Sequence, residues 1–211
     1  MRYAWLAAVA VPLALAGAPA AQASDRGPYV AVMMTGSEPS GPKPTASTDL
    51  DGFSGVGLSA AVGYRWLPLR VELEYQGNTA YWIGSLFSGS GDDRIQMKTL
   101  MLNAIVEAQL NGWLGVFFGA GFGQADVRAD FVTCLQLQGC LAPAESHASG
   151  SASARQTQLG VTVGPFHQHQ VVIGFRWLKS GRLGLADTAG RPFEEDRAKA
   201  KMSFVGWRGS F

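Results

Sequence analysis

The chain has 211 residues, with 17 basic and 16 acidic side chains, 27 glycines and an aromatic content of 10%. The near-neutral charge argues against a nucleic-acid partner, and the glycine content suits closely packed strands better than helices. Beyond the amino-terminal segment, no stretch has about 18 uninterrupted apolar residues, so a transmembrane helix is not expected.

Residues 1–23 are predicted to be a secretory signal. Arg2 supplies the positive charge, residues 5–16 form a short apolar run, and Ala21-Gln22-Ala23 is a small-x-small cleavage site. Removing Arg2 from the 17 basic residues leaves 16 basic and 16 acidic residues in the mature chain. Residues 24–211 are then expected to form one domain.

The mature chain alternates between polar and apolar residues in segments that read as strands. The first, residues 27–34, is almost wholly apolar, so the pattern does not indicate which side faces outward. The other predicted strands are residues 52–66, 70–76, 95–110, 113–126, 155–166, 170–178 and 197–211. Short turns are expected at 67–69, at Asn111-Gly112 and at 167–169, and they alternate with long polar loops. Those loops are residues 35–51, 77–94, 127–154 and 179–196.

An even number of strands, joined alternately by short turns and long loops, is the plan of outer-membrane barrels. A lipocalin-like soluble barrel also has eight strands, but its interior should be apolar and its exterior polar. Here one face of the strands carries Leu, Val, Phe, Trp and Tyr, and the other carries Arg, Glu, Gln, Ser and Gly. Charged side chains face lipid only at high cost. We therefore predict an all-β, eight-stranded, antiparallel, up-and-down transmembrane β-barrel with a polar interior.

The last strand ends on an aromatic residue, and Val205, Trp207 and Phe211 share one of its faces. A membrane barrel must pair its last strand with its first, because an open edge in lipid leaves backbone groups without partners. We expect the partner to be the segment around Tyr29 and Met33. The alternative is the closing strand of a soluble barrel or sandwich.

Seven charged residues are predicted to point into the barrel. A functional interpretation makes them a polar plug or a narrow gate, whereas a structural one makes them a salt-bridge network that fills the lumen. An eight-stranded barrel is only wide enough inside for side chains, which favours the network. The seven residues are Arg65, Arg70, Glu72, Glu74, Glu107, Arg176 and Arg208.

Cys134 and Cys140 are the only cysteines of an exported chain and are predicted to form a disulfide in the third long loop. A metal site there is the weaker alternative, because only His147 lies nearby. His167 and His169 are expected to face the periplasm without a metal. No nucleophile, base and orienting acid can be placed together, so neither an enzyme nor a cofactor is expected.

The sequence resembles the small porin-like, opacity-type outer-membrane proteins, also called surface antigens. The motifs are GPYVAV, VGYRWLPLRVELEY, MLNAIVE, GVFFGAGFG, VIGFRW and the terminal Phe211. The resemblance implies a Gram-negative outer membrane and recognition of Val205, Trp207 and Phe211 by the barrel assembly machinery.

The function expected from this resemblance is a non-enzymatic surface protein whose long loops mediate adhesion or other surface interactions. A structural or narrow-channel protein without a specific ligand is the alternative. The expected partners are outer-membrane lipid, the assembly machinery and an extracellular partner bound by the loops, and we expect a monomer.

Overall fold

The computed structural model describes residues 26–40, 53–82, 94–134, 143–165, 169–185 and 197–211. These residues form eight strands and, among themselves, no helix. The strands are β1 (Arg26–Ser40), β2 (Phe53–Trp66), β3 (Leu69–Trp82), β4 (Arg94–Gln109), β5 (Leu114–Cys134), β6 (Pro143–Val163), β7 (His169–Ser180) and β8 (Lys199–Ser210). Within these ranges no helix is long and apolar enough to cross a membrane.

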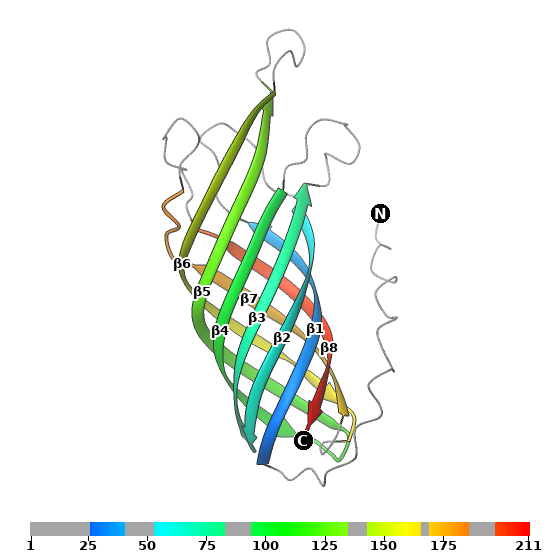
Figure 1. Cartoon of the computed structure of the whole chain (residues 1–211). Helices are drawn as coiled ribbons and strands as arrows, with labels where there is room; N and C mark the ends of the chain where they lie inside the picture. Colours follow the sequence, from blue (N-terminus) through cyan, green and yellow to red (C-terminus); the bar gives the residue numbers. More distant parts are fainter. Residues whose placement is uncertain (1–25, 41–52, 83–93, 135–142, 166–168, 186–196) are drawn as a thin grey trace.

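Each strand pairs antiparallel with its neighbours in sequence, and β8 pairs with β1 to close the barrel (Figure 1). In the closing pair, Val205 lies opposite Met34, and Trp207 lies opposite Val32. The predicted eight-stranded, antiparallel, up-and-down barrel is therefore confirmed. Closure gives every edge strand a partner, as a sheet in lipid requires.

The two faces of the sheet separate by residue type, as period-2 strands do. In β2, Val56, Leu58 and Val62 are exposed on the outer surface, while Ser59 and Ala61 are buried inside. The same alternation runs through β4 and β7. In β1, which the sequence left ambiguous, Tyr29, Ala31, Met33 and Thr35 are buried and Val32 is exposed.

The short turns gather at one end of the barrel. Asn111 shapes one of them, since its side-chain oxygen accepts hydrogen bonds from the amides of Trp113 and Leu114, both at 2.8 Å. The carboxyl end of β8 lies at this same end (Figure 1). In outer-membrane barrels the end with the short turns is the periplasmic end, and the opposite end is the extracellular one.

Several strands are longer than the sequence predicted. Residues 77–82, 127–134 and 143–154 were expected in loops, but they extend β3, β5 and β6. The prediction looked for apolar side chains on the outer face, whereas the extended parts carry polar ones there, such as Arg128 and Ser149. Figure 1 shows β5 and β6 continuing as a two-stranded ribbon well past the ends of the other strands.

The barrel interior is apolar toward the extracellular end. Leu183 and Leu185, which follow β7, are buried in this region although the sequence predicted a polar loop there. They are buried because they pack with small and aliphatic side chains from the extracellular parts of the strands. The apolar cluster comprises Ala80, Ile95, Met97, Val127, Ala129, Ala148, Leu178, Leu183, Leu185, Ala198, Ala200 and Met202.

Candidate functional site

The seven charged residues predicted for the lumen are all buried, each with at most 4% of its surface exposed. They come from five strands and lie on the inward faces of those strands. The set contains four arginines and three glutamates, so most of the charge is compensated within the barrel. The residues are Arg65, Arg70, Glu72, Glu74, Glu107, Arg176 and Arg208.

Glu107 of β4 is the centre of the periplasmic half of this network. Arg208 of β8 donates to both of its oxygens, from Nη2 to Oε1 at 2.7 Å and from Nη1 to Oε2 at 3.0 Å. Arg70 of β3 donates from Nη1 to Oε2, also at 3.0 Å. The hydroxyl of Thr162 donates to Oε1 at 3.0 Å. One carboxylate thus joins four strands through charge-assisted hydrogen bonds.

Glu72 and Glu74 of β3 form a second centre. The hydroxyl of Tyr29 donates to Glu72 Oε2 at 2.7 Å. Asn103 Nδ2 lies between the two carboxylates, 3.2 Å from Glu72 Oε1 and 3.0 Å from Glu74 Oε2. Arg176 Nη1 makes an ion pair with Glu74 Oε1 at 2.7 Å. These contacts tie β1, β3, β4 and β7 together across the lumen.

Amides and aromatic rings complete the surroundings of the arginines. Arg176 donates to the side-chain oxygens of Gln76 at 2.6 Å and Gln158 at 3.0 Å. Its guanidinium lies 5.0 Å from the centroid of Phe204, within cation–π range. Arg70 similarly lies 5.5 Å from the ring of Tyr29 and 5.3 Å from that of Phe117.

Sequence reasoning did not single out Tyr29, Asn103 and Gln158, which bind the predicted charges. A signal was present in the glycine column of β5. A Cβ placed on Gly121 would lie 1.9 Å from Asn103 Oδ1, so the glycine makes room for that amide. Glycines facing inward therefore mark where long side chains of neighbouring strands cross the lumen, including apolar ones such as Ile105 beside Gly119.

The paired side chains of this network fill the lumen. Each buried carboxylate accepts hydrogen bonds from arginine, amide or hydroxyl donors, which offset the cost of taking it out of water. Below the apolar cluster, these side chains bridge the lumen from one wall to another. Among the described residues, the three lumen carboxylates Glu72, Glu74 and Glu107 are all engaged in these contacts.

Val205 and Phe211 are exposed on the outer surface, at 38% and 52% of their area. Trp207 is half-buried, and its ring stacks on His169 with centroids 5.4 Å apart. The backbone amide of Phe211 donates to the carbonyl of Pro28 at 3.1 Å. The role of these three residues as an assembly signal stays a prediction.

Cys134 is the last residue of β5, and Cys140 lies outside the described residues. The predicted disulfide therefore stays a prediction. Among the described residues, no group of three or more His, Cys, Asp or Glu side chains could hold a metal ion. His167 also lies outside the described residues, and His169 opens β7.

His147 lies in β6 rather than in the predicted loop, opposite Asp130 of β5. Its Nδ1 is 2.9 Å from Asp130 Oδ1, and Arg94 Nη2 is 3.2 Å from Asp130 Oδ2. The hydrogen bond from His147 lowers the pKa of the Asp130 carboxyl, and Arg94 adds to this effect. This cluster joins the first residue of β4 to the base of the extended β5–β6 ribbon on its outer face.

Comparison with known proteins places this barrel among solved structures. Neisserial surface protein A matches with a TM-score of 0.60 at 15% identity, over 90% of this chain and 99% of that one. Ail, the attachment invasion locus protein of Yersinia pestis, matches with a TM-score of 0.51 at 13% identity, over 89% of this chain and 100% of that one. At these identities the similarity shows the fold alone. A search of curated proteins gives no match.

The family model described as "Outer membrane protein beta-barrel domain" matches residues 7–168, which is more than half of the chain. The match agrees with the closed barrel, its apolar outer wall and its polar lumen. It also places the protein in the outer membrane of a Gram-negative bacterium. The chain belongs to the outer membrane protein β-barrel family.

Proposed function

We propose that this is a non-conducting, non-enzymatic surface protein that presents its extracellular end for adhesion or other surface interactions. One observation carries the proposal: the lumen is filled with paired side chains, while the β5–β6 ribbon extends past the rest of the barrel (Figure 1). A chain that closes its interior and lengthens one hairpin outside the membrane is built to display that hairpin.

The filled lumen argues against the narrow-channel alternative. An ion on its way through the barrel would have to break the ion pairs of Glu107 and Glu74 and then cross the apolar cluster around Leu183 and Leu185. Removing one member of a buried ion pair leaves an uncompensated charge, which costs several kcal/mol. We therefore expect no single-channel current from the wild-type protein in a planar bilayer.

The ribbon is built as a stable platform. At its base, where Arg94 of β4 lies opposite Asp130, the outer face is cross-linked by the Arg94–Asp130–His147 cluster. Within the barrel wall, Gln124 donates a hydrogen bond of 2.6 Å to Ser151. Rigid elements hold a binding surface in place with little loss of conformational entropy on binding. One structural neighbour, Ail, is named for attachment and was crystallised with the heparin analogue sucrose octasulfate. Heparin is therefore a suitable first probe.

The test shortens the ribbon and keeps the barrel. Residues 131–146 are replaced by Asn-Gly, which joins the paired residues Asp130 and His147 with a two-residue hairpin turn. Because this change also removes both cysteines, the matched control is the full-length chain with Cys134→Ser and Cys140→Ser. Heat-modifiable gel mobility establishes that both variants assemble.

Binding of cells or proteoliposomes to surfaces coated with heparin or extracellular-matrix protein is then measured. We expect the wild type and the cysteine-free control to bind and the shortened variant to lose binding. Unchanged binding of the shortened variant would show that the ribbon is not the binding element. Steady currents from the wild type, with no binding to any coated surface, would favour the channel.

A further inference from the structure

We propose that residues 181–185, here called the strap, form a hinged seal over the extracellular mouth of the lumen. The strap closes the mouth by packing two leucines into it, and it opens while the strands of the barrel stay paired. This role is independent of the adhesion function. It rests on how the strap is attached, on what it covers and on the polar groups that lie beneath it.

The strap follows β7 and is anchored by backbone hydrogen bonds at its first residue. Gly181 N donates to the carbonyl of Ser153 at 2.7 Å. Just before it, Ser180 N donates to the carbonyl of Ala198 at 2.8 Å, and the Ser180 hydroxyl accepts from Ala198 N at 2.8 Å. Among the described residues, no backbone hydrogen bond holds residues 182–185 to the barrel. The strap can therefore turn about Gly181 without breaking a ladder between two strands.

Beyond Gly181, the strap alternates between outward and inward residues. Arg182 and Gly184 are exposed, whereas Leu183 and Leu185 are buried and join the apolar cluster. Five members of that cluster are alanines, so the small side chains of the wall leave the space that the two leucines fill. Figure 1 shows the strap, in orange, beside the extended part of β6. Apolar packing of the two leucines is thus what keeps the strap closed.

Two glycines fit the strap to the barrel in this closed position. A Cβ on Gly150 of β6 would collide with the carbonyl oxygen of Leu183 and would lie 3.0 Å from Leu185 Cδ2. Only a glycine at this position lets the strap approach β6 so closely. Gly184 has a φ of 65°, a conformation that favours glycine, and it lies between the two leucines.

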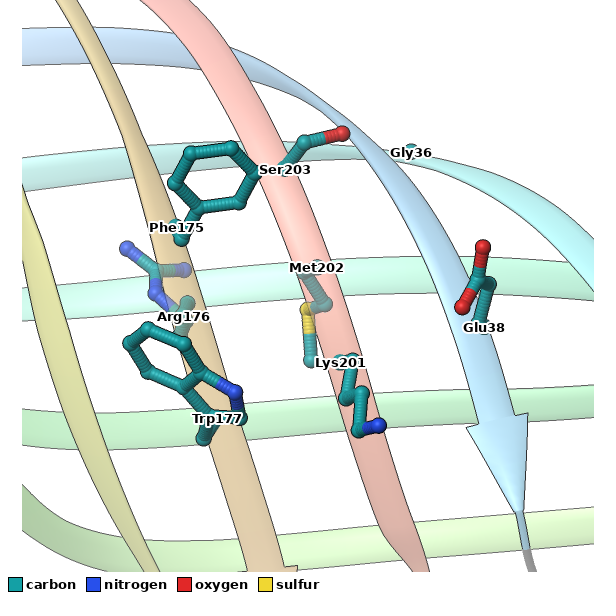
Figure 2. Close-up of a pocket in the computed structure, with 8 residues that line it drawn as sticks. All are labelled: Gly36, Glu38, Phe175, Arg176, Trp177, Lys201, Met202 and Ser203. Atoms are coloured by element: carbon teal, nitrogen blue, oxygen red, sulfur yellow. The ribbon is translucent and has the colours of Figure 1, made fainter.

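Polar groups lie beneath the strap, where the apolar cluster meets the charged network. Met202 belongs to the cluster, but its sulfur accepts a hydrogen bond from Gln76 Nε2 at 2.8 Å. It also lies opposite Arg176 on the neighbouring strand (Figure 2). At this level four buried side-chain atoms have no hydrogen-bond partner among the described residues: Ser37 Oγ, Thr99 Oγ1, Gln156 Oε1 and Arg176 Nε. Their residues lie opposite a member of the cluster or two positions from one along the same strand.

These groups give the strap an open state as well as a closed one. Closing keeps the two leucines out of water, which stabilises the closed state. Opening lets water reach the four polar atoms, whose burial without a partner costs free energy of the same order. Opposing contributions of similar size allow a segment to open locally while the rest of the fold stays intact.

The experiment measures how fast a membrane-impermeant methanethiosulfonate reagent labels single thiols in the refolded full-length protein in lipid vesicles. All variants carry Cys134→Ser and Cys140→Ser. Thr99→Cys reports on the space beneath the strap, because Thr99 is 2% exposed and lies two residues from Met97 on the inward face of β4. Thr162→Cys, beside Glu107 in the network, reports opening of the whole barrel. Ser149→Cys is exposed on β6 and gives the full reactivity.

The test variant is Gly150→Ala, which displaces the strap without changing any residue of it. Gly77→Ala is the matched control, since a Cβ there has nothing within 4 Å. We expect slow labelling of Thr99→Cys with the strap intact and labelling at least about tenfold faster in Gly150→Ala, from the steric overlap. In Gly77→Ala we expect a change of less than about twofold. Leu183→Ser with Leu185→Ser removes the packing instead of adding a clash and should act like Gly150→Ala.

Heat-modifiable gel mobility establishes that each variant assembles, and the leucine variant serves if Gly150→Ala does not. Thr162→Cys should stay unlabelled throughout, because the charged network still blocks the lumen. Equal acceleration of Thr99→Cys and Thr162→Cys would mean that the whole barrel opens and would overturn the proposal. Unchanged labelling in both strap variants would show that the strap is not the seal. With the strap intact, a Thr99→Cys thiol that never reacts would show a fixed plug, and one as reactive as Ser149→Cys would show an open mouth, and either result would also overturn it.

Discussion

Glu107 shows how a single residue can hold the lumen together. Its carboxylate is 1% exposed and accepts hydrogen bonds from Arg208, Arg70 and Thr162. A buried charge in this position is tolerated only when its oppositely charged partners are present. The same holds for the partners, which need the carboxylate of Glu107. Arg208 therefore depends on this one acidic side chain, whereas Arg70 also makes an ion pair with Glu72 Oε2 at 3.9 Å.

We expect Glu107→Ala to lower the free energy of unfolding by about 3–5 kcal/mol, because it leaves the buried Arg208 without its carboxylate and removes the shorter of the two ion pairs of Arg70. The measurement is urea unfolding of the refolded protein in lipid vesicles. Asp126→Asn is the control, since Asp126 is exposed and accepts one long hydrogen bond, 3.4 Å from Gln124. A loss for Glu107→Ala no larger than that of the control would show that the network contributes little to stability.

Asp130 offers a titration on the extracellular ribbon. Its pKa lies below the ordinary carboxyl value of 3.8, chiefly because His147 hydrogen-bonds to the ionised form. A lowered folded-state pKa means that this contact stabilises the ribbon above the ordinary carboxyl pKa. The stabilisation is lost as the pH falls through the lowered value.

We expect His147→Gln to raise the pKa of Asp130 toward 3.8, because the largest lowering contribution is removed. The measurement is an NMR titration of the Asp130 carboxyl carbon. His169→Gln, at the other end of the barrel, should leave this titration unchanged. An Asp130 curve that does not move in His147→Gln would mean that the two side chains do not interact in solution.

At the scale of single elements, the outward residues of β8 change from charged to apolar with their depth in the membrane. Val205 is exposed midway along β8, two residues from Ser203 and four from Lys201 at the extracellular interface. An outward position must be apolar where it meets the hydrocarbon and tolerates charge near the headgroups. The order Lys201, Ser203, Val205 follows this change of environment along one face.

We expect Val205→Arg to cost about 2–4 kcal/mol of unfolding free energy, the range for arginine near the bilayer midplane. Ser203→Arg should cost less, since it lies closer to the interface. Equilibrium unfolding from lipid vesicles measures both. Equal and small costs would place β8 outside the hydrocarbon and contradict a membrane-spanning closing strand.

In the extended parts of β5 and β6, the polarity of the outward and inward residues is reversed relative to the membrane-spanning parts. Within the membrane, an outward position such as Phe122 is apolar, and its inward neighbour Gly123 is small. Past the membrane, the outward position meets water. There Arg128 is exposed and its neighbour Val127 is buried. The period-2 alternation continues past the membrane interface. A prediction that requires apolar outward residues ends the strand at that interface and assigns the following residues to a loop.

For the whole molecule, strand number, strand order and the assignment of faces could be predicted, because period-2 alternation and turn chemistry are local properties of the sequence. The seven inward charges could be named for the same reason. Their pairing could not, since contacts such as Arg208 with Glu107 depend on strand register around the closed barrel. The burial of Leu183 and Leu185 also depends on closure, which gives an irregular segment an apolar interior to enter.

Closure itself can be tested by cross-linking, because it fixes which residues of β1 and β8 are opposite each other. Met34 lies opposite Val205, whereas Trp207 is two residues further along β8. Directly opposite residues have Cα atoms about 4.5–5.5 Å apart, within disulfide reach. Diagonal neighbours are about 7–8 Å apart, which exceeds it. The register therefore predicts one cross-link and excludes another.

In a background of Cys134→Ser and Cys140→Ser, we expect Met34→Cys with Val205→Cys to form a disulfide under mild oxidation. Met34→Cys with Trp207→Cys is the matched control and should not. Because the bond closes most of the chain into a ring, it should raise the unfolding free energy by about 5 kcal/mol in the chain-entropy model. Peptide mapping and gel mobility under non-reducing conditions give the readout. Cross-linking of the control pair instead would show a register shifted by two residues, and failure of both pairs would mean that β1 and β8 do not close the barrel.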